Sequence, residues 1–214
     1  MTVTFPRTDI MSMAAYSIDT TPAMLQSRQE TSRLANGATR GKDLGPALWV
    51  LSFATIPMLN EDASAFEAAL DTLDGLINPF EAADLRRAMP RAYPDGGCND
   101  GVLNSVNANN KALSLSGLIA GQIVSAGDFL SFAYGVNRAY HRVAETVTAN
   151  GSGLTPEFEV RPFIRPGWTL SPSTVVKLKN PRGLFTLIPG SVSSKLADAG
   201  IYSQVSFQAQ QYLR

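Results

Sequence analysis

The spacing of hydrophobic residues changes along the chain, and it first becomes clear in LWVLSFATI (48–56). Trp49, Leu51 and Phe53 alternate with smaller residues, which is typical of a β-strand with a buried face. Pro57 follows and lacks the N–H group that a strand ladder needs. The pattern therefore predicts a largely buried strand that ends at residue 56.

The segment after this strand has helical spacing. Apolar residues recur at i, i+3, i+4 and i+7, at Phe66, Ala69, Leu70 and Leu73. Asn60 is suited to cap the N-terminus, Glu61 and Asp62 place negative charge in the first turn, and Gly75 is suited to end the helix. We expect one helix, with Phe66 and Leu70 packed on the strand that carries Trp49 and Phe53.

From residue 93 onward, short strand patterns alternate with turns. Candidate strands are KALSLSGL (111–118), GQIV (121–124), DFLSFAYG (128–135), NRAYHRVAETV (137–147) and FEVRPFI (158–164). STVVKLK and GLFTLIPG read as a further strand pair, and Val205, Phe207 and Ala209 share one face of the last strand. We predict one domain from residues 1–93 and 174–214, and a small antiparallel β-unit, 94–173, that is inserted in it or follows it.

The N-terminal region predicts a polar hairpin. Residues 10–18 and 23–35 flank the turn-prone sequence DTTP, and the second segment carries polar side chains on both faces. Residues 35–46 are rich in glycine and basic residues and read as a long loop.

Composition and charge exclude several classes of protein. Lys and Arg number 18, Asp and Glu number 18, and no basic run is longer than Arg86-Arg87, so no surface that tracks nucleic-acid phosphates is evident. A net charge near zero suits a subunit of an assembly. Cys98 is the single cysteine, which excludes an internal disulfide and a cysteine-based zinc site.

The sequence shows no targeting segment. The N-terminus has no apolar core of a signal peptide, and no stretch approaches eighteen consecutive apolar residues. We therefore expect neither a signal peptide nor a membrane span, and a protein that is made and kept, or assembled, in a cytosol.

Candidates for catalysis have simpler interpretations. His141, the only histidine, has no nucleophile or metal ligand near it in sequence and reads as a surface or rim residue. Glu157 and Glu159 are two residues apart on a strand, which fits a solvated face or ion pairs with Arg161 and Arg165 better than a glycosidase pair.

The remaining candidates for chemistry lie in turns and on strands. Asp95, Asn99 and Asp100 supply oxygen ligands but match no calcium loop, and Cys98 reads as exposed and without an activating partner. Aromatic residues form either a sugar-stacking platform or core, at Tyr134, Tyr140, Phe158, Phe163 and Trp168. We expect no catalytic residue, cofactor or metal.

Several stretches resemble the distal tail and minor tail proteins of long-tailed bacteriophages and gene transfer agents. These stretches are FPRTD, ALWVLSFATIP, EDASAFEAALDTLDG, VSAGDFLSFAYGVNRAYHRVAETVTANGSGLTPEFEVRPFIRPG and VVKLKNPRGLFTLIPGS. The resemblance implies a mostly β α+β fold: a tail-tube-like antiparallel β-sandwich with one packed helix, plus a small β-unit. The sandwich would be a tube-like ring domain of residues 1–93 and 174–214, with residues 94–173 as the small β-unit.

The resemblance also implies a function. The chain would be a structural subunit of the tail tip, a ring that is expected to be a hexamer and that joins the tail tube protein to hub and fibre proteins. It would be assembled in the host cytoplasm and remain in the virion tail. The candidate contact residues are Arg28, Arg33, Arg40 and Lys42, facing acidic neighbours or the lumen where DNA passes. Simple solvation at the surface accounts for each of them equally well.

Two other functions remain open from the sequence. A carbohydrate-binding β-module for host adhesion would stack sugar on Tyr134, Tyr140 and Trp168. A glycoside hydrolase would use Glu157 or Glu159.

Overall fold

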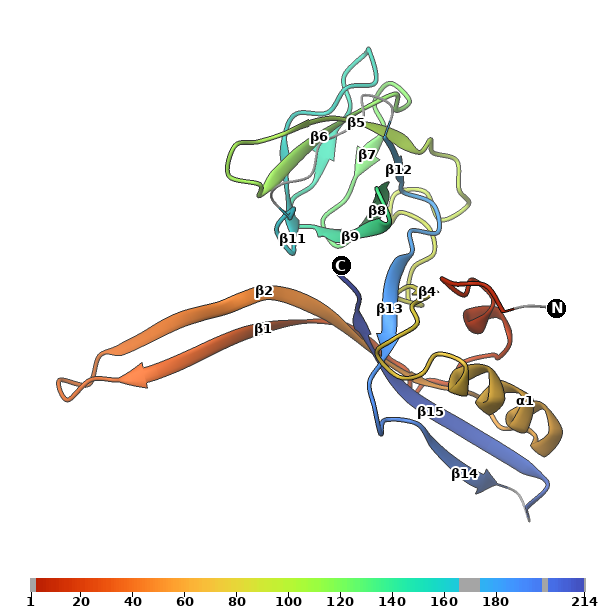
Figure 1. Cartoon of the computed structure of the whole chain (residues 1–214). Coiled ribbons are helices and arrows are strands. Elements are labelled where there is room, and N and C mark those ends of the chain that lie inside the picture. Colours follow the sequence, from red (N-terminus) through yellow and green to blue (C-terminus); the bar gives the residue numbers. More distant parts are fainter. Residues whose placement is uncertain (1–2, 166–173, 198–199, 214) are drawn as a thin grey trace.

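The chain folds into a sheet with a helix and a separate barrel, as a computed structural model that describes residues 3–165, 174–197 and 200–213 shows (Figure 1). The chain leaves the sheet after β4, forms the barrel, and returns to the sheet at β13. All strand pairs in both units are antiparallel, and the described residues contain one α-helix. The expected mostly β α+β class is confirmed.

The seven-stranded sheet has the order β1-β2-β15-β13-β4, with β14 and β3 also paired to β15. Its strands are β1 (Thr21–Arg33), β2 (Thr39–Ala54), β3 (Met58–Leu59), β4 (Phe80–Ala82), β13 (Gly183–Leu187), β14 (Ser193–Ala197) and β15 (Tyr202–Gln211). A short 3₁₀ helix, η1 (Ile10–Ser12), precedes the sheet, and the α-helix, α1 (Asn60–Asp71), follows β3.

The closed barrel has the order β11-β6-β5-β12-β8-β9. Its strands are β5 (Gly101–Val106), β6 (Ala112–Ser116), β8 (Phe129–Tyr134), β9 (Asn137–Val143), β11 (Phe158–Arg161) and β12 (Val175–Lys177). A small two-stranded sheet of β7 (Ile123–Val124) and β10 (Val147–Thr148) lies outside this ring of strands.

Strand β15 forms the floor of the core under α1. Val205, Phe207 and Ala209 are buried on one face, as their spacing predicts. Phe207 contacts Phe66 of the helix and Phe53 of β2, with ring centroids 5.9 Å and 5.0 Å apart. Helix α1, rather than a second sheet, forms the layer over the apolar face, and its predicted apolar stripe is buried.

The ends of α1 differ from the expectation. Asn60 does not cap the helix, because its Nδ2 donates to the Gly200 carbonyl (2.7 Å) and its Oδ1 accepts from the Ser203 hydroxyl (2.8 Å). The helix thereby ties itself to the start of β15. Its last residue is Asp71, and Gly75 lies beyond it in the turn that follows, with φ +64°.

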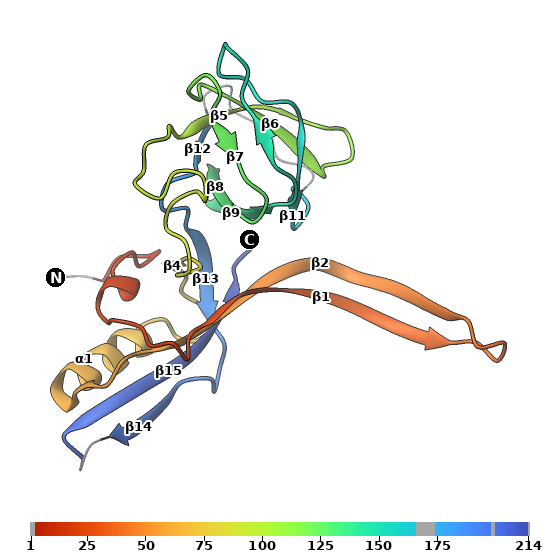
Figure 2. The same cartoon turned by 180° about the vertical axis from the view of Figure 1, so that it is seen from behind.

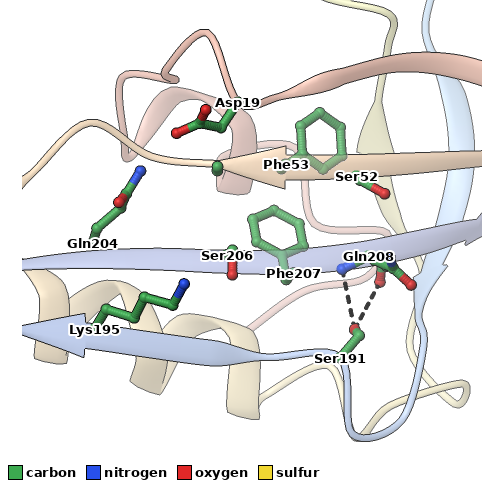
Figure 3. A pocket seen from close by; sticks show the side chains of 10 residues that line it. Asp19, Ser52, Phe53, Ser191, Lys195, Gln204, Ser206, Phe207 and Gln208 are labelled. Atoms are coloured by element: carbon green, nitrogen blue, oxygen red, sulfur yellow. Dashed lines mark hydrogen bonds between the residues drawn. The ribbon is translucent and has the colours of Figure 1, made fainter.

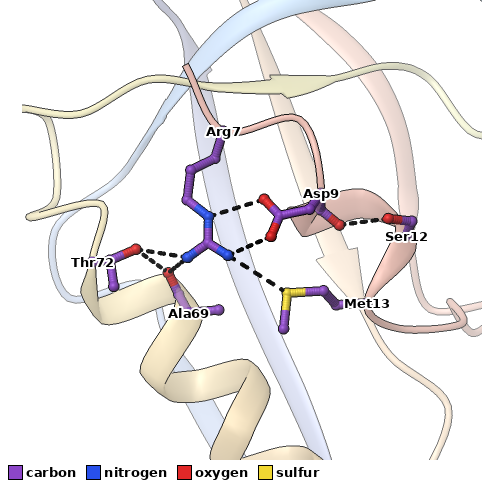
Figure 4. Close-up of polar contacts among 6 residues, drawn as sticks. All are labelled: Arg7, Asp9, Ser12, Met13, Ala69 and Thr72. Atoms are coloured by element: carbon purple, nitrogen blue, oxygen red, sulfur yellow. Dashed lines mark hydrogen bonds and ion pairs between the residues drawn. The ribbon is translucent and has the colours of Figure 1, made fainter. Parts of the chain in front are cut away.

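Arg7 holds the N-terminal segment against the last turn of α1 (Figure 4). Its Nη1 donates to the Ala69 carbonyl (3.2 Å) and to the Thr72 hydroxyl (2.9 Å). Its Nε and Nη2 donate to the carboxylate of Asp9, and this hydrogen bond lowers the pKa of Asp9. A cation is favourable there because the C-terminal end of a helix is partially negative.

The N-terminal hairpin forms from other segments than those predicted. Residues 10–18 form η1 and irregular chain, so the expected strand there is wrong. β1 pairs instead with β2, which begins at Thr39 and includes most of the expected loop 35–46. Gly41 and Gly45 lie within this strand, although the conformational freedom of glycine favours a loop.

The barrel extends further along the chain than the expected boundary at residue 173. Val176 of β12 pairs with Gly101 of β5 and with Phe132 of β8. The predicted pairing of STVVKLK with GLFTLIPG is therefore wrong, because β13 pairs with β4 and β15 in the sheet. Residues 175–177 belong to the barrel.

Aromatic side chains join the two units. The Trp49 indole on β2 donates from Nε1 to the Tyr140 carbonyl on β9 (3.0 Å), and its ring lies 5.5 Å from that of Phe129. Tyr140 also contacts Phe185 of β13. Trp49 therefore packs at the barrel junction and not directly beneath the helix.

Within the described ranges, no helix combines the length and the apolar character that a membrane crossing needs.

Candidate functional site

The most prominent surface feature is a two-stranded arm, residues 26–46, that extends from the sheet (Figures 1 and 2). It is the outer part of the β1–β2 hairpin, where pairing continues from Gln26↔Leu48 to Arg33↔Thr39. From Gln26 to Arg33 the strand rise gives a reach of about 24 Å. Residues 26–33 are exposed throughout, and so are residues 39–46 except half-buried Gly45.

All four candidate contact residues lie on this arm and are exposed. Lys42 lies opposite Glu30 and Arg40 opposite Ser32 on one face of the hairpin, whereas Arg33 lies opposite Thr39 on the other face. None of these four basic residues of the arm forms an ion pair with another described residue. The arm therefore presents solvated basic side chains on both faces.

The arm has little to hold it in place within its own chain. A two-stranded hairpin in water is marginally stable unless a third strand, a core or another element covers it. Register shifts near Arg28 interrupt the pairing, and Gly41 and Gly45 contribute no side chain to pack. A hairpin of this kind is stabilised further when another molecule packs on it or pairs with its edge.

The exposed face of α1 has the opposite charge. Glu61, Asp62 and Asp71 are exposed and Glu67 is half-buried, and the helix contains no Lys or Arg. The helix and the arm project from opposite ends of the sheet (Figures 1 and 2). The arm carries four basic residues against the acidic Glu30 and Asp43, so its net charge is positive and that of the helix face is negative, although the net charge of the chain is zero.

The sheet face opposite α1 is open and polar. Ser52 of β2, Gln204, Ser206 and Gln208 of β15 and Lys195 of β14 line a shallow hollow of about 440 Å³ (Figure 3). The hydroxyls of Ser191 and Ser206 donate to backbone carbonyls. The hollow is a polar surface, and these two hydroxyls are not aligned with a general base.

His141 is buried, so the expectation of a surface or rim position is wrong. Its Nδ1 lies 2.8 Å from the Pro162 carbonyl, which indicates that Nδ1 carries the proton and donates it. Nε2 has no partner among the described residues. Burial lowers the pKa of His141 to about 4, so the ring is neutral at pH 7 and serves the barrel core.

The carboxylate candidates form structural contacts. Glu159 pairs with Arg161 (2.7 Å), as the sequence predicts, and exposed Glu157 accepts a hydrogen bond from Ser105. Asp100 accepts from the Lys177 side chain and from the backbone N–H groups of Leu178 and Lys179, which follow β12. No group of three or more His, Cys, Asp or Glu residues suited to a metal occurs within the described part of the chain.

Cys98 differs from the expectation, whereas two of the aromatic residues follow the core alternative. Cys98 is buried and not exposed, and burial raises the pKa of its thiol. Tyr140 is 1% exposed and Phe158 is fully buried, so neither presents a ring to a sugar. Tyr134 is half-buried, Phe163 is exposed beneath Lys111 and Arg161, and Trp168 lies outside the described residues. Tyr140 and Phe158 therefore follow the core alternative, and a sugar-stacking platform that includes Tyr140 does not form.

Two further features are not among the candidates predicted from the sequence. The acidic face of α1 could be found from the absence of basic residues in NEDASAFEAALD. Nothing in RAYHRV distinguishes Arg142 from an exposed strand arginine, yet its guanidinium lies over the rings of Trp49 and Phe129. That contact joins residues distant in sequence, so no local signal predicts it.

Comparisons with known proteins yield no relative. No protein-family model matches the chain, and no curated protein matches it. Any assignment of function therefore rests on the geometry of the chain and on the resemblance of its sequence.

Proposed function

We propose that this chain is a structural subunit of the tail tip of a long-tailed bacteriophage or gene transfer agent. Its copies form a ring, expected to be a hexamer, that joins the last ring of the tail tube to the hub and fibre proteins. It acts by binding its neighbours and not by catalysis. The ring assembles in the host cytoplasm and remains in the virion tail.

The observation that carries this proposal is the exposed arm. Residues 26–33 and 39–46 form a long hairpin that no other described part of the chain covers. Such a hairpin gains stability when a neighbour packs against it or extends its strands. A subunit of a ring has such a neighbour on each side.

The charges favour a head-to-tail contact. The basic arm and the acidic face of α1 lie at opposite ends of the sheet (Figure 1), so the arm of one copy can meet α1 of the next. Contacts between two different surfaces of identical subunits close into rings when the rotation between them is a whole fraction of a turn. Opposite charges at such a contact fix orientation and speed association.

The test is the assembly state of the full chain and of an arm-shortened variant. In the variant, residues 27–47 are replaced by Asn-Gly, a two-residue turn suited to connect the paired residues Gln26 and Leu48. We expect rings in negative-stain images of the full chain, alone or with a tail tube protein. The shortened variant should keep the barrel and the sheet, as measured by circular dichroism, and form no rings.

A different result would refute the proposal. If the full chain stays monomeric at high concentration and binds neither tube nor hub proteins, it is not a ring subunit. If the shortened variant assembles as well as the full chain, the arm does not make the contact.

A further inference from the structure

A hollow of about 400 Å³, lined by arginines, lies where the barrel meets the sheet. Its wall consists of three segments: the loop after β4, the turn before β8 and the paired strands β8 and β9. The residues that line it are Asp84, Arg86, Arg87, Ala126, Gly127, Phe129 and Arg142. Three guanidinium groups thus face one hollow with a single carboxylate among the lining residues.

Arg142 is held rigidly but has no carboxylate partner. Its guanidinium lies 4.6 Å from the ring centroid of Trp49 and 4.9 Å from that of Phe129, and Nη2 donates to the Ala23 carbonyl (2.9 Å). No ion pair joins it to another described residue, and its remaining N–H groups are not enclosed. Burial and the charge of Arg86 lower the pKa of Arg142, and the charge of Asp84 offsets only part of this effect.

Arg87 has unused hydrogen-bond donors. Its Nη1 lies 3.6 Å from Oδ1 of Asp128, a distance too long for a hydrogen bond, and its side chain is 44% exposed. It forms no side-chain hydrogen bond with the described residues. Arg87 can therefore turn its planar fork toward the hollow without breaking a hydrogen bond, and only its long ion pair with Asp128 would lengthen.

The neighbouring carboxylates are already occupied. Asp84 accepts from the backbone N–H groups of Ala23 and Arg86 and from the guanidinium of Arg86, and its side chain is 2% exposed. Buried Asp128 accepts from the backbone N–H groups of Arg91 and Ser125. These hydrogen bonds leave both carboxylates charged, so Asp84 and Asp128 offset two of the three arginines. The hollow is therefore rich in donors and keeps a net charge of about +1.

We propose that this hollow binds an oxyanion, the phosphate or carboxylate group of a ligand, through Arg87 and Arg142 with Arg86 at its rim. Guanidinium forks match the two oxygens of either group and form charge-assisted hydrogen bonds with them. The aromatic rings beneath Arg142 fix its orientation before the ligand arrives. This site does not depend on ring formation and would exist in a monomer.

The test measures anion binding to the full chain by calorimetry and by thermal unfolding. Inorganic phosphate and malonate serve as probes, each compared with sodium chloride of the same ionic strength. We expect both to raise the melting temperature beyond the chloride control, because a ligand of the native state stabilises it. Stronger binding of phosphate would identify a phosphate-bearing ligand, and stronger binding of malonate a carboxylate.

Two matched pairs of variants locate the site. Arg87→Gln should weaken binding about tenfold, the effect of about one charge-assisted hydrogen bond, whereas Arg33→Gln on the arm makes the same charge change and should leave binding intact. Ala126→Glu places a carboxylate at the hollow and should abolish binding, while Ala126→Gln, of nearly equal size, should retain it. Anions that stabilise no more than chloride, or full affinity in Arg87→Gln, would overturn the proposal.

Discussion

The barrel and the arm differ in the pairing of their strand edges. Each barrel strand pairs on both sides, as β8 does with β9 and β12, and the interior is filled by its own apolar residues, among them Leu130 and Phe132. In the arm, each strand has one unpaired edge and both faces are exposed. The barrel therefore encloses a core of its own, whereas the arm has no such cover within the described residues and would gain stability from a neighbouring molecule.

The seven-stranded sheet lies between these extremes. Helix α1 covers its apolar face, while the opposite face is polar and open (Figure 3). The alternation along β15 accounts for this difference, because residues 203, 205, 207, 209 and 211 are buried and those between them are not. An antiparallel sheet of this type is stable with one wet face.

The largest expected effect on stability comes from the core of the sheet. Phe207→Ala removes the ring that contacts Phe53, Phe66 and Phe80, and it should lower the free energy of unfolding by about 3–5 kcal/mol. Urea unfolding followed by circular dichroism measures it. Ser206→Ala, on the open face of the same strand, is the control and should change stability by less than about 0.5 kcal/mol. Equal effects would mean that both faces are covered.

The second expected effect is a pH dependence of barrel stability. The folded pKa of His141 is about 4, below the ordinary 6.5, so between these values the unfolded chain binds the extra proton. Stability is therefore full above about pH 6.5 and falls as the pH drops toward 4. The loss is about 3 kcal/mol.

His141→Asn tests the assignment of this pH dependence. Asn retains a donor near the position of Nδ1 for the Pro162 carbonyl but does not titrate. Urea unfolding between pH 4 and 7 gives the free energy of unfolding at each pH. This free energy should change less with pH in the variant than in the parent chain. An unchanged slope would assign the pH dependence to other groups.

Substitutions in the arm should have the smallest effect on stability. They should weaken ring formation instead. The double variant Arg40→Glu and Lys42→Glu should alter the free energy of unfolding by less than about 0.5 kcal/mol, because both side chains are exposed and unpaired. Light scattering should show weakened ring formation. Added salt should weaken the parent rings in the same direction.

A charge swap checks that the partner surface is α1. Combining the double variant with Glu67→Lys and Asp71→Lys restores opposite charges at the proposed contact. Both positions lie in the later part of the helix, where the partially negative C-terminal end favours a cation. Recovery of rings would support the arm-to-helix contact, and no recovery would place the arm against another surface.

The sequence predicts the elements whose stability is local. The stripe of α1 and the alternation of Val205, Phe207 and Ala209 follow from helical and strand periodicity alone. The arm's residues are recognisable as polar and exposed, but their partner strand is not. Because the stretch around Gly41 and Gly45 resembles a loop, its pairing with β1 becomes evident only in the fold.

Features that depend on distant residues escape prediction. His141 is buried because β11 and the chain after it close over it, and Arg142 is held by Trp49 from another unit. β12 joins the barrel because its edges match β5 and β8, although β13 lies nearer in sequence. Such placements are set by long-range packing, which local patterns do not encode.

Hydrogen exchange tests the contrast between the barrel and the arm most directly. In dilute, monomeric protein, the amides of residues 26–33 and 39–46 should exchange rapidly while those of β8 and β9 stay protected. At concentrations where rings form, the arm amides should become protected and the barrel amides should not change. Arm amides that are as protected as the barrel in the monomer would contradict the account, because the arm would then be stable without a partner.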